Sequence, residues 1–162
     1  MVKIITKKDF MDYYKKQPAR SSFEKRRANF YLDMYDNPLV DALYLHYIDN
    51  NEFIGECVLI FKDERSCYEF EYEKDILKKK SACLIKNLRI IENKQGLGYF
   101  SKFLNEIKQI AKTKNCKYLT FSVNKDNSHA LAVYKHLKAH KFGEEHVYKD
   151  SGPMIFMQIN IE

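Results

Sequence analysis

A turn with two closely spaced glycines limits the fold of this chain more than any other segment. It follows a β-rich run at residues 84–91, and apolar side chains then recur at helical spacing from residue 100 onward. Between these two segments, residues 93–98 read Asn-Lys-Gln-Gly-Leu-Gly. Glycine lets backbone N–H groups approach an anion closely, and a helix N-terminus carries partial positive charge. The segment is therefore a candidate phosphate-binding turn between a strand and a helix.

Other periodic segments predict further helices and strands on both sides of this turn. Thr6 to Asp9 and Ser21 to Glu24 each resemble a capping box at the start of a helix. Aromatic and acidic side chains alternate strictly from Tyr68 to Glu73, which favours an additional strand. The predicted helices are residues 6–16, 21–35, the segment after the glycine turn, and 127–139. The predicted strands are residues 2–5, 42–48, 53–61, 69–73, 83–91, 118–123, 145–149 and 154–161.

This order of elements predicts an α/β fold, with a central mixed sheet and helices on both faces. The 162 residues contain no repeat or linker, so we expect one domain over residues 1–162. No apolar run is long enough to cross a bilayer, and the N-terminus lacks a secretory signal. The four cysteines are scattered without metal-binding spacing. We therefore expect a cytoplasmic protein that binds no membrane.

Charge and histidine spacing give little support to nucleic-acid or metal binding. The net charge is +6, but the basic runs at 25–27 and 78–80 lack interleaved aromatic residues. A nucleic-acid surface is therefore not expected. His136 and His140 are four residues apart on a predicted helix, where they could face one metal ion. No neighbouring carboxylate or cysteine completes a ligand set, so no metal is expected.

The glycine turn by itself does not match two common phosphate-binding motifs. A Walker loop requires Gly-Lys-Ser/Thr at its end, and this sequence has none. A dinucleotide fingerprint requires a third glycine where Ser101 stands. An ordinary tight turn, with no ligand, therefore remains open at this point.

A second motif downstream narrows the choice of ligand for the glycine turn. Asn127, Ala130 and Tyr134 share one face of a predicted helix, after the strand at 118–123. With Gly96 and Gly98, they make residues 84–134 resemble the acetyl-CoA-binding core of the GNAT superfamily of N-acetyltransferases. Asn93 departs from that pattern, since the family usually has Arg or Gln at this position.

The resemblance implies that acetyl-CoA is the co-substrate and lies between two strands that splay apart. Main-chain groups near Leu88 and Ile90 would pair with the pantetheine arm, and amides of the turn would bind the pyrophosphate. The implied cofactor-binding residues are Leu88, Ile90, Asn93, Lys94, Gln95, Gly96, Leu97, Gly98, Tyr99, Ser101, Asn127 and Ala130.

The resemblance also implies direct transfer of an acetyl group to a primary amine, with Tyr134 donating a proton to the departing thiolate. Glu92 and Glu56 are the candidate general bases for the amine. Six acids between residues 63 and 75 suggest a cationic acceptor, although charge on a solvated edge strand explains them as well. A catalytically silent module that binds acyl-CoA or a protein is the alternative function. Either a monomer or a homodimer is compatible with the sequence.

Overall fold

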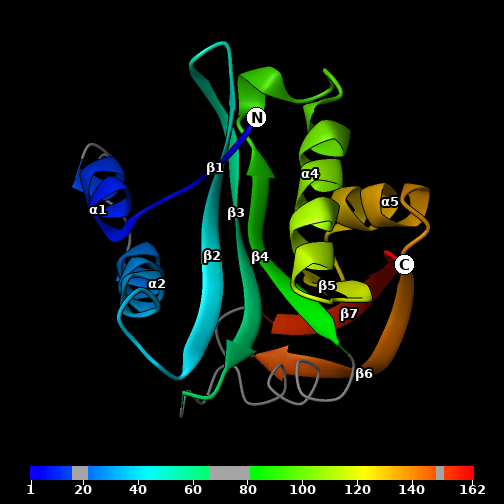
Figure 1. Cartoon of the computed structure of the whole chain (residues 1–162). Helices are drawn as coiled ribbons and strands as arrows, with labels where there is room; N and C mark the ends of the chain where they lie inside the picture. Colours follow the sequence, from blue (N-terminus) through cyan, green and yellow to red (C-terminus); the bar gives the residue numbers. More distant parts are fainter. Residues whose placement is uncertain (16–21, 66–80, 149–151) are drawn as a thin grey trace.

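One mixed sheet organises the protein. The computed structural model describes residues 1–15, 22–65, 81–148 and 152–162. Within these ranges seven strands join in the order β1-β2-β3-β4-β5-β7-β6 (Figure 1). All neighbours pair antiparallel except β4 and β5, which are parallel. The strands are β1 (Val2–Ile4), β2 (Val40–Asp49), β3 (Glu52–Asp63), β4 (Ala82–Ile90), β5 (Tyr118–Asn124), β6 (His140–Tyr148) and β7 (Gly152–Asn160).

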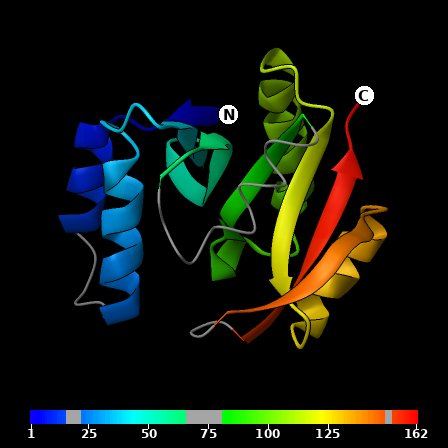
Figure 2. The ribbon, with the colours of Figure 1, turned by 90° about the horizontal axis from the view of Figure 1, so that it is seen from below.

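Helices lie on both sides of this sheet, which confirms the predicted fold class. Figures 1 and 2 show α1 and α2 beside the first strands, with α4 and α5 away from them near the later strands. A short 3-10 helix, η2, precedes α4. The bounds are α1 (Lys7–Lys15), α2 (Ser22–Asp33), η2 (Glu92–Lys94), α4 (Tyr99–Thr113) and α5 (Ser128–His136).

Two apolar clusters result from the alternation of side chains along the central strands. In β2, Leu45 points into the larger cluster with Phe103 and Ile107 of α4. Its neighbour Tyr44 points the opposite way, into a cluster with Phe10 of α1. Because successive strand residues face opposite sides of a sheet, β2 and β3 contribute to both clusters. These two clusters define an α4 side and an α1 side of the sheet.

The first predicted capping box is confirmed. The backbone N–H of Asp9 donates to the Thr6 hydroxyl oxygen at 3.2 Å, and the backbone N–H of Thr6 donates to the Asp9 carboxylate at 3.3 Å. These bonds satisfy N–H groups that the first helical turn leaves unpaired. Hydrogen bonds from Thr6 also hold the pKa of Asp9 below its ordinary value. The second predicted box begins at Ser21, outside the described residues.

The prediction was wrong at the end of the last helix. Helix α5 ends at His136, and His140 opens β6 instead of continuing the helix to residue 139. Lys138 adopts a left-handed backbone conformation with φ of 59°, which no helix can continue. His136 and His140 therefore do not share a helix face. Strand β6 begins at residue 140 instead of 145, because Phe142 pairs with Phe156 of β7.

Most other boundaries agree within a few residues, and the predicted strand at 69–73 lies outside the described residues. No described helix is both long and apolar enough to span a bilayer. In the described ranges no three His, Cys, Asp or Glu side chains are grouped so that they could hold a metal ion.

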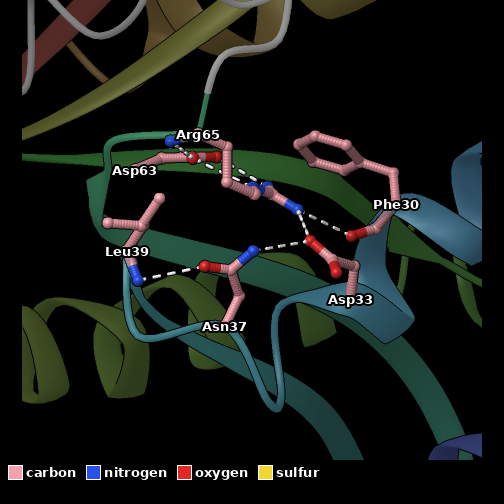
Figure 3. A network of polar contacts seen from close by, with 6 residues as sticks. All are labelled: Phe30, Asp33, Asn37, Leu39, Asp63 and Arg65. Carbon is pink, nitrogen blue, oxygen red and sulfur yellow. Dashed lines mark hydrogen bonds and ion pairs between the residues drawn. The ribbon is translucent and has the colours of Figure 1, made fainter.

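A buried ion pair at the end of β3 ties this strand to helix α2 (Figure 3). Arg65 donates from Nε and Nη2 to the two oxygens of Asp63, at 3.0 and 2.6 Å. Its Nη1 reaches the carbonyl oxygen of Phe30 at 3.0 Å and the Asp33 carboxylate at 3.1 Å. The guanidinium also lies 3.8 Å from the centre of the Phe30 ring. Asn37 extends the network from Asp33 to the backbone of Leu39.

We expect Arg65→Met to destabilise the protein by about 3 kcal/mol, because it leaves the buried Asp63 carboxylate without its cation. Urea denaturation measures this change in the free energy of unfolding. Lys62→Met is the matched control: Lys62 pairs with Glu64 at 3.2 Å, but both side chains are about half exposed. That pair should contribute less than about 1 kcal/mol. Equal losses in the two variants would show that burial of the Arg65 pair contributes nothing.

Candidate active site

A β-bulge interrupts the pairing of β3 with β4 at the centre of the sheet. Val58 pairs with Lys86 and Glu56 pairs with Arg89, so the single residue Cys57 faces two residues of β4. One of these, Asn87, has a positive φ of 53°. Asparagine tolerates this conformation better than most residues. The bulge turns the end of β4 away from the path that its first half follows.

The buried carboxylate of Glu56 holds this bulge in place. The side chain is 2% exposed and accepts three hydrogen bonds. Asn87 donates from Nδ2 at 3.1 Å and Arg89 from Nε at 2.5 Å, both to Oε1, while the Tyr44 hydroxyl donates to Oε2. Burial and the adjacent carboxylate together raise the pKa of Tyr44 far above its ordinary value. One acid on β3 therefore connects β2 with both ends of the bulge.

A glycine on β3 allows the two strands to approach closely just after the bulge. Gly55 pairs with Ile90. A Cβ atom at position 55 would collide with the carbonyl oxygen of Arg89 and lie 2.9 Å from Cδ1 of Ile90. Glycine is needed here for space, since its backbone is not in the left-handed region.

Just before the bulge, β4 and β5 stop pairing with each other. The two strands pair only over Ala82 to Ile85 and Tyr118 to Phe121. Strand β4 then continues to Ile90 alongside β3, and β5 continues to Asn124 alongside β7. In the described residues, backbone pairing between these two strands of one sheet thus ends at Ile85 and Phe121 while both strands continue, and we call this unpaired region the opening.

The glycine turn lies between the end of β4 and the start of α4. Helix η2 occupies Glu92 to Lys94, an element the sequence did not predict. Gly96 and Gly98 follow with φ of 74° and 76°, and a Cβ atom at either position would meet no atom within 4 Å. Glycine is therefore required at both positions by the backbone conformation, since L-residues rarely adopt such angles. Gly98 is also the N-cap of α4 and offers no side chain to its first N–H groups.

Several side chains of the turn point back to the protein. Lys94 donates to Glu52 at 2.6 Å, which raises the pKa of Lys94. Gln95 donates from Nε2 to the carbonyl of Ile90 at 3.0 Å, and the Tyr99 hydroxyl donates to Asp49 at 2.9 Å. The turn is thus fixed through its side chains to the β2–β3 hairpin and to the end of β4. Asn93, Leu97 and Ser101 are exposed, as are the two glycines.

Helix α5 presents the second motif beside β5. Asn127 is its N-cap, and the Asn127 side-chain oxygen accepts from the N–H of Ala130 at 3.0 Å. Tyr134 stacks on Phe121 of β5, with ring centres 4.8 Å apart and planes at 30°. Burial raises the pKa of the Tyr134 phenol above its ordinary value of about 10. This hydroxyl therefore keeps its proton throughout the neutral range.

The candidate acid and one candidate base lie on opposite faces of the sheet. Tyr134 packs against the cluster on the α4 side. Glu56 hydrogen-bonds Tyr44, which belongs to the cluster on the α1 side. Glu92, the other candidate base, is an exposed residue of η2, just beyond the end of β4.

Only the beginning of the acidic segment at 63–75 is described. Asp63 is paired with Arg65, and Glu64 lies 3.2 Å from Lys62. Both carboxylates therefore have a cation of their own next to them. The acids from residue 69 onward lie outside the described ranges.

Known proteins share the family sequence profile and the fold of this chain. The profile of the acetyltransferase (GNAT) family matches residues 6–138, which is most of the chain. The chain belongs to the GNAT acetyltransferase family. This confirms the resemblance inferred from the two motifs, and proteins of this family use acetyl-CoA as co-substrate. Among curated proteins, none gives a significant match.

Solved structures of acetyltransferases share the whole fold at low sequence identity. An IAA acetyltransferase from Bacillus cereus is 17% identical with a TM-score of 0.62, covering 99% of this chain and 98% of its own. A spermidine/spermine N-acetyltransferase from Vibrio cholerae is 14% identical with a TM-score of 0.63, covering 99% and 92%. A ribosomal-protein-alanine N-acetyltransferase from Brucella melitensis is 14% identical with a TM-score of 0.59, covering 99% of each chain. These similarities establish the fold.

Sequence reasoning missed the bulge and the residues around Glu56. The spacing of apolar residues along β4 could have revealed the bulge. Cys83 and Ile85 face the larger cluster, but the next residues of β4 to do so are Leu88 and Ile90. The spacing of three between Ile85 and Leu88 breaks the period of two, which is the mark of an extra residue. The partners of Glu56 on β2 have no such pattern, because they depend on register between strands.

We expect Gly98→Ala to destabilise the protein by about 1 kcal/mol, since a left-handed conformation is costly for alanine. Gly98→Asn should cost less, because asparagine tolerates that region. Thermal denaturation measures stability, and calorimetric titration with acetyl-CoA measures binding, which should weaken more in the alanine variant. If alanine and asparagine behave alike in both measurements, the backbone angle at Gly98 is not the constraint.

Proposed function

We propose that this protein transfers an acetyl group from acetyl-CoA directly to a primary amine. The observation that carries the proposal is the opening between β4 and β5, with the glycine turn after β4 and Tyr134 beside β5. Strand β4 continues to Ile90 without a β5 partner, so its main chain can pair with an extended ligand arm. This is the arrangement that a thioester with a long pantetheine chain requires.

The residues of the turn fit a pyrophosphate. The backbone amides from Gln95 to Tyr99 surround two glycines with open space beside them. Glycine at both positions allows N–H groups to converge, and the N-terminus of α4 adds its partial positive charge. The Ser101 hydroxyl, exposed in the first turn of α4, is a further candidate donor. We therefore assign the phosphates of acetyl-CoA to this turn and its pantetheine arm to the main chain at Leu88 and Ile90.

Tyr134 is the proposed acid. Acetyl-CoA supplies an activated acetyl thioester. As the amine nitrogen bonds to the acetyl carbon and the carbon–sulfur bond breaks, the Tyr134 hydroxyl gives its proton to the sulfur. Its phenol is protonated at neutral pH, so it holds the proton that the sulfur takes as the carbon–sulfur bond breaks, and solvent then returns a proton to the phenolate. Stacking on Phe121 orients the ring.

The amine must lose its protons before and during the transfer. At pH 7 this costs about 4–5 kcal/mol for a lysine-like amine. A carboxylate has about four acceptor positions, and Glu56 already uses three of them. We therefore propose that Glu56 positions the bulge, and that Glu92 is the better placed of the two carboxylates to accept a proton from solvent-exposed substrate.

We expect Tyr134→Phe to lower kcat by about 100-fold, the usual contribution of a general acid. The KM for acetyl-CoA should stay within about twofold, since the phenyl ring can still stack on Phe121. Because burial raises the pKa of the phenol, the wild type should keep its activity up to at least about pH 9, with no alkaline loss from this group. Steady-state kinetics from neutral to alkaline pH tests both points. Unchanged turnover in the variant would remove Tyr134 from the mechanism.

We expect Glu56→Gln to lower stability by about 2 kcal/mol and to raise the KM for acetyl-CoA, because Arg89 and the bulge lose their charged partner. The kcat should fall less than in a variant that removes the base. Glu92→Gln is the matched variant: it should leave the melting temperature unchanged and lower kcat, because the amine then loses its proton acceptor. If kcat falls in Glu56→Gln and not in Glu92→Gln, Glu56 is the base.

The alternative function is a module that binds acyl-CoA without turnover. Asn93, exposed in η2 where the family usually carries Arg or Gln, is the residue that favours it. Release of free CoA in the presence of an amine panel, measured with a thiol reagent, separates the two functions. Binding of acetyl-CoA without any CoA release would establish the silent module.

A further inference from the structure

The charged pair beside the opening presents only its cation to solvent. The side chain of Glu56 is 2% exposed, whereas that of Arg89 is 48% exposed. Arg89 lies directly after the bulge and directly before Ile90, on the α1 side of the sheet. A ligand that approaches the opening from this side therefore meets a guanidinium group and not a carboxylate.

The Arg89 guanidinium has donors to spare for a ligand. Its Nε donates to Glu56, and Nη2 donates to the Tyr13 hydroxyl at 3.2 Å. A guanidinium has five N–H donors in one plane. Two of them serve these described residues. The planar fork suits a carboxylate, which it can bind through two parallel hydrogen bonds.

An aromatic group lies next to this cation on the α1 side, where Arg89 contacts the Tyr13 hydroxyl. The rings of Tyr13, His46 and Phe53 contact one another, with centres 4.9 to 5.6 Å apart. Burial lowers the pKa of His46, so this ring is uncharged at neutral pH. We call these three residues the aromatic group. His46 is buried, whereas Tyr13 and Phe53 are partly exposed and offer apolar surface to a ligand whose charge is held by Arg89.

The other described charges beside the aromatic group have partners of their own. Asp9 lies 3.7 Å from Lys3 and accepts two hydrogen bonds from Thr6, so it is already satisfied. Lys86, which precedes the bulge, reaches the Ser122 hydroxyl on β5 at 3.2 Å. Among the described residues, Arg89 is therefore the exposed charge that lies next to the buried Glu56 carboxylate.

We propose that the acceptor amine also carries a carboxylate, which Arg89 binds, and an apolar or aromatic body, which contacts the aromatic group. The acceptor class is then an amino acid with a large apolar side chain. This inference rests on the proposed acetyl transfer and replaces the cationic acceptor suggested by the acidic segment. In the described part of that segment, Asp63 and Glu64 are paired with cations of their own.

Matched amines test this acceptor class. CoA release is measured with phenylalanine and phenethylamine, with tyrosine and tyramine, and with spermidine. We expect kcat/KM to be at least about tenfold higher for each amino acid than for its decarboxylated partner, as one charge-assisted interaction provides. Equal or better turnover of the decarboxylated amines or of spermidine would overturn the inference and leave acetyl transfer intact. No CoA release with any amine, despite acetyl-CoA binding, would instead overturn the proposed function.

Variants of Arg89 test the residue itself. Arg89→Lys keeps a cation beside Glu56, so the variant should fold. It loses the planar fork, so the KM for phenylalanine should rise about tenfold. Its KM for phenethylamine and for acetyl-CoA should not change. Glu56→Gln/Arg89→Gln removes the pair together and guards against loss of folding through an unpaired charge. Lys112→Gln, on the exposed face of α4, controls for net charge. Equal changes of KM for phenylalanine and phenethylamine would show that Arg89 has only a structural role.

Discussion

The buried carboxylate of Glu56 is the interaction on which the candidate site depends. It reaches Tyr44 on β2 and both Asn87 and Arg89 on β4, so a single side chain of β3 fixes three strands. A carboxylate in this position is tolerated only because its oxygens are supplied with donors and a cation. The same contacts hold Asn87 in a left-handed conformation. Without this anchor the bulge would lose the bonds that offset the unpaired residue.

The opening in the sheet lies directly beside the bulge. Pairing between β4 and β5 stops at Ile85 and Phe121, although both strands continue. A regular parallel pair would have closed this gap with backbone hydrogen bonds and left no room for a ligand. The protein thus gives up ladder bonds in the centre of its sheet. It does so where a ligand arm can replace them, which links the irregularity to the proposed function.

The opening connects two chemically different sides of one sheet. The α4 side carries the glycine turn, α5 and the Tyr134 phenol, all suited to a phosphate-bearing thioester. The α1 side carries Glu56, Arg89 and the aromatic group, which are suited to an acceptor. In the proposed function the sheet separates the two substrates, so that each binds its own face and the two meet at the opening. The proposed direct transfer between them needs no covalent enzyme intermediate.

Local sequence determined the elements and the glycine turn, because periodicity, capping residues and left-handed glycines act over a few neighbouring residues. It also placed Asn127, Ala130 and Tyr134 on one helix face, and hence indicated the family. Only the tertiary structure decided the partners of Glu56, the bulge at Asn87 and the exposure of Arg89. These depend on strand register, which brings Tyr44, Glu56 and Arg89 together although they lie far apart along the chain. Periodicity within one strand cannot specify which residue of another strand will lie opposite, so the fold decided which residues form the proposed acceptor side.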